Sequence, residues 1–373
     1  MSDQTLPPPG PVLVTGANGY VASWLVKRLL EGGYDVHATV RDPGDPKRTA
    51  HLREIAAGSP GALSFFRADL LDPDGFDRAM AGCTLVFHTA SPLIVRDVED
   101  PMRDLVEPAT RGTRNVLEAA NRTPSVQRVV LTSSIVAVYG DSADLEDLGA
   151  DRFDERHWNS TSNEHHQPYS YSKTVAEQMA WEMAGAQDRW ELVVVNPGLV
   201  LGPGLSPHTK AEGVLIMLDF GNGYYTFGAP ELEFAIVDVR DVAEGHLRAG
   251  MMPGASGRHI LVSESLSVIG IAEVLRGHFG DGFPFPRHTV SRAVALMLAP
   301  RRGIPQAVAK RNLGYPLRFD NRRAREALRM RFRPAAESIV EHFQQLLDDG
   351  LVTRSGRERS VSDSTPRHRV SPG

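Results

Sequence analysis

The start of the chain holds the feature that most restricts its fold: a short apolar run leads through a glycine-rich turn into a helical pattern. Val12–Gly16 predicts a buried strand, and Tyr20–Glu31 carries apolar residues at helical spacing before the chain reaches Gly32 and Gly33. Asp35–Val40 then alternates between polar and apolar residues, as a half-buried strand does. Strand, turn, helix and strand within about 30 residues form a βαβ unit, so we expect a parallel sheet.

The same alternation continues along the chain. Amphipathic segments at Pro101–Ala120 and Tyr169–Ala184 predict helices between further short apolar strands. Those strands are Leu63–Phe66, Leu85–His88, Arg128–Thr132 and Leu192–Val195. Apolar strands that alternate with helices indicate a parallel sheet covered on both faces. The predicted fold class is therefore α/β, a Rossmann doubly wound parallel sheet.

The second half of the chain has a different residue pattern. From about Gly202 the pattern becomes irregular and rich in glycine, proline and aromatic residues, as in Gly221–Gly228. This predicts a smaller C-terminal substrate-binding lobe that supplies a pocket rather than more sheet. A late amphipathic helix is predicted at Ala335–Leu347.

These patterns divide the chain into four parts. We expect residues 1–10 to be a disordered N-terminus and residues 11–200 to form the Rossmann domain, with a return of the chain near 233–250. Residues 201–352 are expected to form mainly the substrate-binding lobe. Residues 353–373 are polar, rich in arginine, serine and proline, and lack apolar periodicity, so they predict a disordered tail.

Composition excludes several classes of function. A net charge of −5 gives no reason to expect a nucleic-acid partner. The single cysteine, Cys83, cannot form an internal disulfide, and its place before an apolar strand favours a small buried side chain. The N-terminus lacks the pattern of a signal peptide, and no apolar stretch is long enough to span a bilayer. We therefore expect a cytoplasmic protein without a membrane partner.

The turn between the first strand and the first helix has the composition of a phosphate-binding loop. Gly16 permits a tight turn, Gly19 lets the backbone approach a pyrophosphate, and Ala22 lets the helix pack closely on the strand. The N–H groups and partial positive charge of the helix N-terminus would then meet the phosphates. The cofactor-binding residues expected here are Gly16, Asn18, Gly19, Tyr20 and Val21.

The end of the second strand indicates which dinucleotide binds. A Rossmann enzyme that uses NAD places an acidic residue at this corner, where it holds the ribose hydroxyls. Here the strand ends in Arg41, with Lys47 and Arg48 close behind, and these cations favour the 2′-phosphate of NADP(H). In the alternative reading Asp42 takes the ribose and the cofactor is NAD(H).

A tyrosine and a lysine form the predicted catalytic pair. Tyr169 and Lys173 are four residues apart on a predicted helix, so they share one face. A phenol is a poor proton shuttle at neutral pH unless a nearby ammonium stabilises its anion. Ser134, at the end of a predicted strand, would hydrogen-bond the substrate oxygen beside Tyr169, and Ser133 is the less favoured choice.

The chain resembles the extended short-chain dehydrogenase/reductases of the NAD-dependent epimerase/dehydratase superfamily. Within them it is similar to the branch of dihydroflavonol-4-reductase and cinnamoyl-CoA reductase. The matching segments run from about residue 12 to about residue 250. They are TGANGYVASWLVKRLLEGGYDVHATVRDP, FRADLLDPDGFDRAMAGCTLVFHTASP, GTRNVLEAA, RVVLTSSIVAV, YSYSKTVAEQMAW, VVVNPGLVLGPGL and VDVRDVAEGHLRA.

The resemblance implies further cofactor contacts. Asp69 and Leu70 would flank the adenine, Thr89 and Ala90 would line the cofactor at the end of the fourth strand, and the nicotinamide side would be held by Pro197, Leu199 and Val200.

The chain departs from the family at two places. Pro108 occupies the position where many relatives have the asparagine of a catalytic tetrad, so we assign no fourth member. Gly140–Gln167 does not match the substrate-contacting stretch of the plant enzymes, so their flavonoid specificity is not transferred. That segment includes His165 and His166, which we interpret as loop residues and not as metal ligands.

The predicted function is an NADP(H)-dependent interconversion of a ketone or aldehyde and its alcohol, with Tyr169 as general acid and base. The partner is a small-molecule carbonyl or alcohol substrate, and the protein is a monomer or a homodimer. Alternatives are a sugar-nucleotide epimerase or dehydratase, a 3β-hydroxysteroid dehydrogenase-like enzyme, and a non-catalytic NADP sensor.

Overall fold

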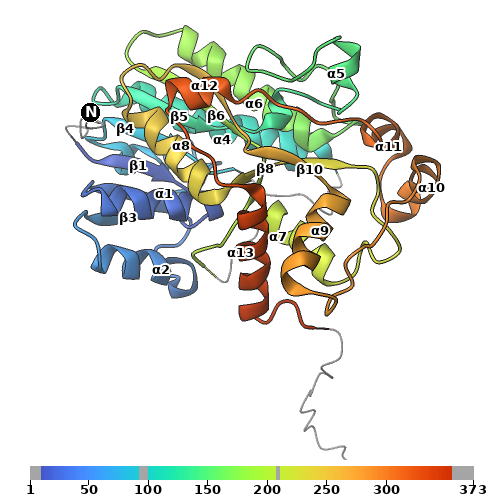
Figure 1. Ribbon diagram of the computed structural model, residues 1–373. Coiled ribbons are helices and arrows are strands. Elements are labelled where there is room, and N and C mark those ends of the chain that lie inside the picture. Colours follow the sequence, from blue (N-terminus) through green and yellow to red (C-terminus); the bar gives the residue numbers. More distant parts are fainter. Residues whose placement is uncertain (1–9, 92–99, 207–210, 355–373) are drawn as a thin grey trace, which may run out of the picture.

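A parallel sheet of seven strands forms the centre of the molecule (Figure 1). The computed structural model describes residues 10–91, 100–206 and 211–354. The strand order is β3-β2-β1-β4-β5-β6-β9, so the order reverses between β1 and β4. The strands are β1 (Val12–Thr15), β2 (Val36–Val40), β3 (Leu63–Arg67), β4 (Leu85–His88), β5 (Arg128–Thr132), β6 (Glu191–Pro197) and β9 (Gly257–Leu261). In such sheets ligands bind beside the reversal, outside the carboxyl ends of the strands.

Helices cover both faces of this sheet, as the apolar strands require. Successive residues of β1 point to opposite sides, so Val12 and Val14 enter one core and Leu13 enters the other. One face is covered by α1 (Tyr20–Glu31), α2 (Pro46–Ala57), α8 (Val239–Met251) and α12 (Arg322–Ala327). The other is covered by α3 (Asp77–Met80), α4 (Glu107–Arg122) and α6 (Pro168–Gly185). The predicted doubly wound α/β fold is confirmed.

The helix predicted from residue 101 has an irregular start. A π-helical turn, η1 (Met102–Val106), precedes α4, and the N–H of Glu107 reaches back to the carbonyl of Met102. Pro108 follows at once and has no N–H to continue the regular ladder. A widened turn at this point joins the two segments.

A second sheet lies in the C-terminal half and corrects one prediction. Its three strands run in the order β10-β8-β7, with β8 antiparallel to β10 and parallel to β7. The elements are β7 (Leu199–Leu201), β8 (Glu233–Asp238) and β10 (Glu264–Ser267), with α7 (Glu212–Gly221), α9 (Val268–Phe279) and α13 (Ala335–Asp348) packed around them.

The expectation of no further sheet after Gly202 is therefore wrong. Gly257 opens the five-residue strand β9 with a φ of +74°, and Arg258 and His259 follow it. A strand that begins with a glycine and two polar residues lacks the apolar run by which the other short strands are recognised, and it gains its place by pairing with β6.

Short helical segments complete the described chain. They are η2 (Ile135–Ala137), α5 (Asp144–Asp147), α10 (Arg292–Leu298), η3 (Ala299–Arg302) and α11 (Gln306–Asn312). Within the described ranges, no helix has the length and apolar character needed to cross a membrane. The predictions for residues 1–9 and 355–373 lie outside the described residues.

Candidate active site

The glycine turn between β1 and α1 leaves the N-terminus of the helix open. Gly16 has a φ of +62°, and a Cβ atom there would lie 3.0 Å from Cβ of Ala90. Gly19 is the N-cap residue of α1, and no side chain caps this end. The first N–H groups of a helix have no partners within it, so they are available to a bound phosphate. Asn18 lies half-buried in the same turn.

Two aromatic side chains of α1 hydrogen-bond the backbone of the segment that follows β7. The hydroxyl of Tyr20 donates to the carbonyl of Gly202, and the indole N–H of Trp24 donates to the carbonyl of Pro203 at 2.8 Å. Any contact of Tyr20 with a phosphate would therefore come from its backbone. Val21 is partly buried against the core beneath α1.

The end of β4 is fixed by a residue that the sequence analysis did not select. The Thr15 hydroxyl accepts the N–H groups of Thr89 and Ala90 at 3.1 and 3.0 Å and lies 2.9 Å from Nδ1 of His88. The Thr89 hydroxyl in turn donates to the carbonyl of Thr15 at 2.5 Å. Since the hydroxyl accepts two N–H groups, its own proton goes to Nδ1 of a neutral His88.

Two buried histidines beside this edge are held neutral. Burial and then the charge of Lys173 lower the pKa of His88 to about 3. Burial also lowers the pKa of His246 to about 4. His246 lies 2.6 Å from the Thr132 hydroxyl and 2.7 Å from the carbonyl of Val242.

The corner after β2 distinguishes Arg41 from Asp42. Both residues are exposed, but Oδ1 of Asp42 accepts the N–H of Gly44 at 2.9 Å and is thereby turned into its own loop. Arg48 pairs with Asp45 at 3.3 Å in the first turn of α2, and Lys47 is exposed beside it. This arrangement favours Arg41 for contact with a 2′-phosphate.

The predicted catalytic pair lies at the start of α6. Tyr169 and Lys173 occupy successive turns, and the Lys173 ammonium is 5.9 Å from the centre of the Tyr169 ring. The same ammonium donates to the Ser91 hydroxyl at 2.8 Å. Burial lowers the pKa of Lys173 to about 8. Burial raises the pKa of Tyr169 above its ordinary value, and the carboxylate of Glu212 adds to this shift.

The first turn of α6 is anchored by a buried aspartate. Gln167, the N-cap residue, has a left-handed φ of +53°, and its amide nitrogen donates to Asp141 at 2.6 Å. Asp141 has no exposed surface and also receives His166 at 2.8 Å and Arg311 at 2.9 Å. This network joins the loop before α6 to the C-terminal half and so fixes the turn that carries Tyr169.

Ser133 and Ser134 have different environments. The Ser133 hydroxyl is buried and donates to Glu177 at 2.5 Å. Ser134 is half-buried, and its hydroxyl accepts the N–H of Val136 at 3.3 Å, which leaves its proton available. Ser134 precedes η2, which packs beside α6. The geometry favours Ser134 as the substrate-facing serine.

Glu177 is a second residue that the sequence analysis missed. It follows Lys173 by one turn on the same face of α6 and is 1% exposed. Its carboxylate accepts Asn196 at 2.8 Å and pairs with Arg258 at 2.6 Å, in addition to Ser133. The amide of Asn196 also donates to the Ser134 carbonyl at 3.1 Å. Glu177 thus ties α6 to the ends of β5 and β6. The available signal was its spacing of four residues from Lys173, which places its carboxylate on the helix face of the predicted pair.

The residues implied by family resemblance lie around the same strand ends. Asp69 is exposed and its carboxylate accepts the N–H of Leu71, while Leu70 packs on Gly112 of α4. The remaining three are Pro197 at the end of β6, and Leu199 and Val200 in β7. Gly198 connects these strands. Only glycine fits there, because a Cβ would lie 2.3 Å from the carbonyl oxygen of Ala235.

A small cavity of about 20 Å³ lies behind Lys173. Its lining includes residues at the ends of β4 and β5 and in α6, among them His88, Ala90, Ser91, Thr132, Ser133 and Glu177. We name the carboxyl ends of β4, β5 and β6 together with the first turns of α6 the catalytic edge. Tyr169 and Ser134 do not line this cavity, so it lies beside the place expected for substrate.

The two adjacent histidines of the loop before α6 have different surroundings. His166 is engaged by Asp141, and His165 is 89% exposed. Within the described residues no group of three or more histidine, cysteine, aspartate or glutamate side chains is arranged to hold a metal ion.

Sequence comparison identifies related enzymes. Residues 12–262 match the family described as NAD dependent epimerase/dehydratase. A cinnamoyl-CoA reductase of Medicago truncatula is 43% identical over 270 residues, which cover 71% of this chain and 79% of the relative. An anthocyanidin reductase of Vitis vinifera is 37% identical, and the match covers 70% of this chain and 79% of the relative.

A solved structure shares the architecture. Yeast methylglyoxal/isovaleraldehyde reductase complexed with NADPH superimposes with a TM-score of 0.71 at 26% identity, and the match covers 92% of this chain and 100% of the other.

Proposed function

Because the chain belongs to the NAD dependent epimerase/dehydratase family, in the short-chain dehydrogenase/reductase branch of cinnamoyl-CoA and anthocyanidin reductases, we propose that it reduces an aldehyde or ketone with NADPH. The observation that carries this proposal is the placement of Tyr169 and Lys173 on successive turns at the start of α6. The Lys173 ammonium is fixed there by the Ser91 hydroxyl at 2.8 Å.

The residues around the glycine turn fit a dinucleotide phosphate. The uncapped N-terminus of α1 offers N–H groups to the pyrophosphate, and the close approach of Gly16 to Ala90 leaves no room for a side chain. Arg41 is free to meet the 2′-phosphate while Asp42 is held by Gly44. The reduced nicotinamide supplies the hydride to the carbonyl carbon when it is bound.

Tyr169 supplies the proton to the carbonyl oxygen. A phenol is ordinarily protonated at neutral pH, and burial raises the pKa of Tyr169 further, so it is in the form that reduction requires. The Lys173 ammonium stabilises the phenolate that forms as the proton leaves, and the Ser134 hydroxyl holds the carbonyl oxygen beside Tyr169. Such proton transfer typically contributes about 10²–10⁴-fold to the rate.

The proposal is tested with a panel of aldehydes and ketones, each assayed with NADPH and NADH in parallel. The measurement is the absorbance of the reduced nicotinamide. We expect NADPH-dependent turnover with at least one carbonyl compound. NADPH binding without turnover on any compound would contradict the proposal and would indicate a cofactor-sensing protein.

A further inference from the structure

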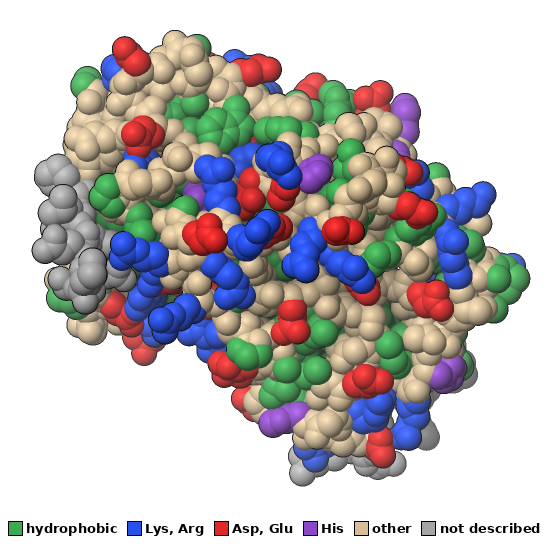
Figure 2. Space-filling view, turned by 45° about the horizontal axis from the view of Figure 1, so that its top comes forward, with side chains coloured by type: hydrophobic (Ala, Val, Ile, Leu, Met, Phe, Trp, Pro, Cys, Tyr) green, Lys and Arg blue, Asp and Glu red, His purple; other side chains and the backbone are tan. Residues whose placement is uncertain are grey.

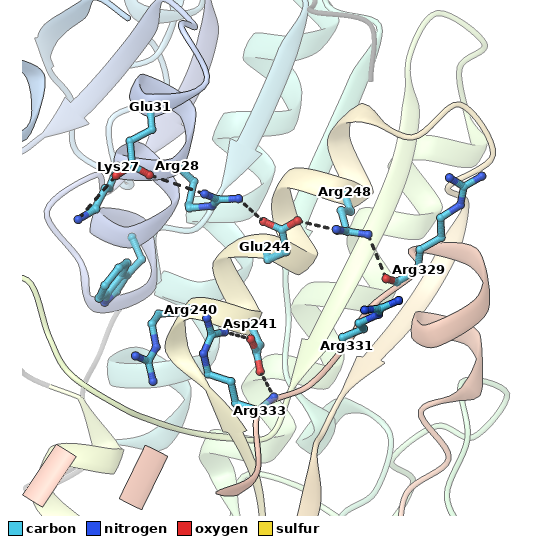
Figure 3. Close-up of a pocket in the computed structure, with 11 residues that line it drawn as sticks. Lys27, Arg28, Glu31, Arg240, Asp241, Glu244, Arg248, Arg329, Arg331 and Arg333 are labelled. Atoms are coloured by element: carbon cyan, nitrogen blue, oxygen red, sulfur yellow. Dashed lines mark hydrogen bonds and ion pairs between the residues drawn. The ribbon is translucent and has the colours of Figure 1, made fainter. Parts of the chain in front are cut away.

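A cavity of about 630 Å³ lies outside the catalytic edge, on the side of the sheet that α1 and α8 cover (Figure 3). None of the predicted catalytic or cofactor-binding residues lines it. Its walls carry seven lysine and arginine side chains and three carboxylates, those of Glu31, Asp241 and Glu244. We name it the arginine cavity. Figure 2 shows Lys and Arg side chains gathered across one face of the molecule, with Asp and Glu between them.

One wall comes from an extended segment between α12 and α13 in which arginine and apolar residues alternate. Met330 is 3% exposed and Phe332 packs against the core beneath α8, so both point inward. Arg331 and Arg333 therefore point to the opposite side, where both line the cavity, as does Arg329 at the start of the segment. Arg329 has a left-handed φ of +52°, and its carbonyl accepts the guanidinium of Arg248 at 3.0 Å.

The carboxylates of the cavity are already engaged by its cations. Glu244 lies between two arginines, 2.9 Å from Arg28 and 2.6 Å from Arg248 (Figure 3). Asp241 accepts the backbone N–H of Arg333 at 2.6 Å and also pairs with its guanidinium. Glu31 faces Lys27 and Arg28, each at 3.7 Å.

Two arginines differ in how far they are compensated. Arg240 is met from behind the cavity by Asp238 at 2.8 Å and Glu341 at 2.6 Å, with Glu337 at 3.9 Å. Arg331 is exposed, and the structure gives it no hydrogen bond or ion pair within residues 10–91, 100–206 and 211–354. Arg331 is therefore the cation of this wall with most capacity for an external anion.

We propose that the arginine cavity binds a small anion that carries two or more phosphate groups. Guanidinium groups match phosphate oxygens with paired hydrogen bonds, and here they come from three separate chain segments. The volume lies in the range of about 300–1,000 Å³ that is usual for small-molecule sites, which is ample for a triphosphate or a nucleotide. This site goes beyond the proposed reductase activity and is separate from the cofactor, because Lys27 lies about two turns from the N-terminus of α1.

The test is calorimetric titration of inorganic tripolyphosphate into the full chain saturated with NADPH, at low salt. Saturation with NADPH keeps the probe out of the cofactor's own phosphate sites. We expect a single saturable site, and Arg331→Glu should weaken the affinity at least about tenfold, since it replaces an attractive charge with a repulsive one. A parallel titration with ATP distinguishes the source: tighter binding than tripolyphosphate identifies a nucleotide site, and equal binding identifies a polyphosphate site.

The matched control is Arg114→Glu. Arg114 is exposed on α4, on the other face of the sheet, and its replacement by glutamate changes the net charge by the same amount as Arg331→Glu. It should leave the affinity within about twofold, because α4 and the helices that line the cavity cover opposite faces of the sheet, so Arg114 does not contact an anion bound there. Arg331→Gln removes the positive charge without reversing it, so it should weaken the affinity for tripolyphosphate by a smaller factor than Arg331→Glu. No saturable binding of either probe, or equal weakening by the two charge reversals, would overturn the proposal whether or not the reductase assay succeeds.

Discussion

The catalytic edge and the arginine cavity both concentrate charged side chains, but they do so under opposite conditions. At the catalytic edge the carboxylate of Glu177 is sealed from water and is satisfied by Ser133, Asn196 and Arg258. In the cavity, Glu244 is shared by two arginines that remain partly in water. Burial makes every unpaired charge costly, so the edge uses few charges with complete sets of partners. Solvent removes that restriction, so the cavity holds many charges loosely paired.

The largest expected difference concerns stability. Glu177→Ala should lower the free energy of unfolding by about 3–5 kcal/mol, because it leaves the buried Arg258 guanidinium without its carboxylate. Glu244→Ala removes a carboxylate from two accessible arginines and should cost less than about 1 kcal/mol. Urea unfolding of both variants measures the difference, and similar costs would break the comparison.

Catalysis should be affected almost as strongly. Tyr169→Phe removes the proton donor and should reduce turnover at least about 10²-fold while cofactor affinity changes only a few-fold. Steady-state rates and NADPH titration separate the two effects. Near-normal turnover in Tyr169→Phe would exclude this residue as the general acid, and Arg114→Glu serves as a surface control whose turnover should match the wild type.

Acid should destabilise the fold through the buried histidines beside the catalytic edge. His246 has a pKa of about 4 in the folded chain and an ordinary value of 6.5, so below pH 6.5 the unfolded chain binds a proton that the folded chain excludes. Stability is therefore lost as the pH falls, by about 2 kcal/mol at pH 5 for this residue.

The contribution of His246 is isolated by unfolding the wild type and His246→Gln at pH 7 and at pH 5. Other titrating groups are common to both proteins and cancel in the difference. A variant whose stability changes with pH as much as that of the wild type would show that His246 is protonated in the fold. The arginines of the cavity stay charged throughout this range.

The smallest effect concerns the exposed cofactor corner. Arg41→Ala should raise the KM for NADPH at least about tenfold and leave that for NADH nearly unchanged, because only NADPH carries the 2′-phosphate. Asp42→Ala should alter neither appreciably, since Asp42 is engaged by Gly44. Equal effects of Arg41→Ala on both cofactors would instead assign the ribose to Asp42.

The sequence predicted the features whose signals are local. The helix Tyr20–Glu31 has the expected bounds, and Tyr169 and Lys173 lie on one helix because four residues make about one turn. The strands predicted up to Leu192–Val195 also lie where expected to within about two residues, because apolar runs between helical segments can be recognised without knowledge of the fold.

Contacts between distant residues could not be predicted in this way. Glu177 meets Arg258 across 81 positions, and Asp141 meets Arg311 across 170. Neither pair has a sequence spacing that distinguishes it from any other pair of charges. The alternation from Arg329 to Arg333 was visible in the sequence, but its meaning depends on α1 and α8 facing it, which only the fold determines.

The buried thiol of Cys83 has a practical consequence for studying the protein. Its side chain has no exposed surface, its sulfur lies 3.4 Å from the carbonyl of Ala79, and burial raises its pKa to about 12. Because this thiol is buried, a thiol reagent can react with it only when the region around α3 opens, and the chain has no second cysteine to react in its place. The rate of modification under native conditions thus measures how often this region opens. Cysteines placed on the surface could each be labelled selectively without first removing Cys83.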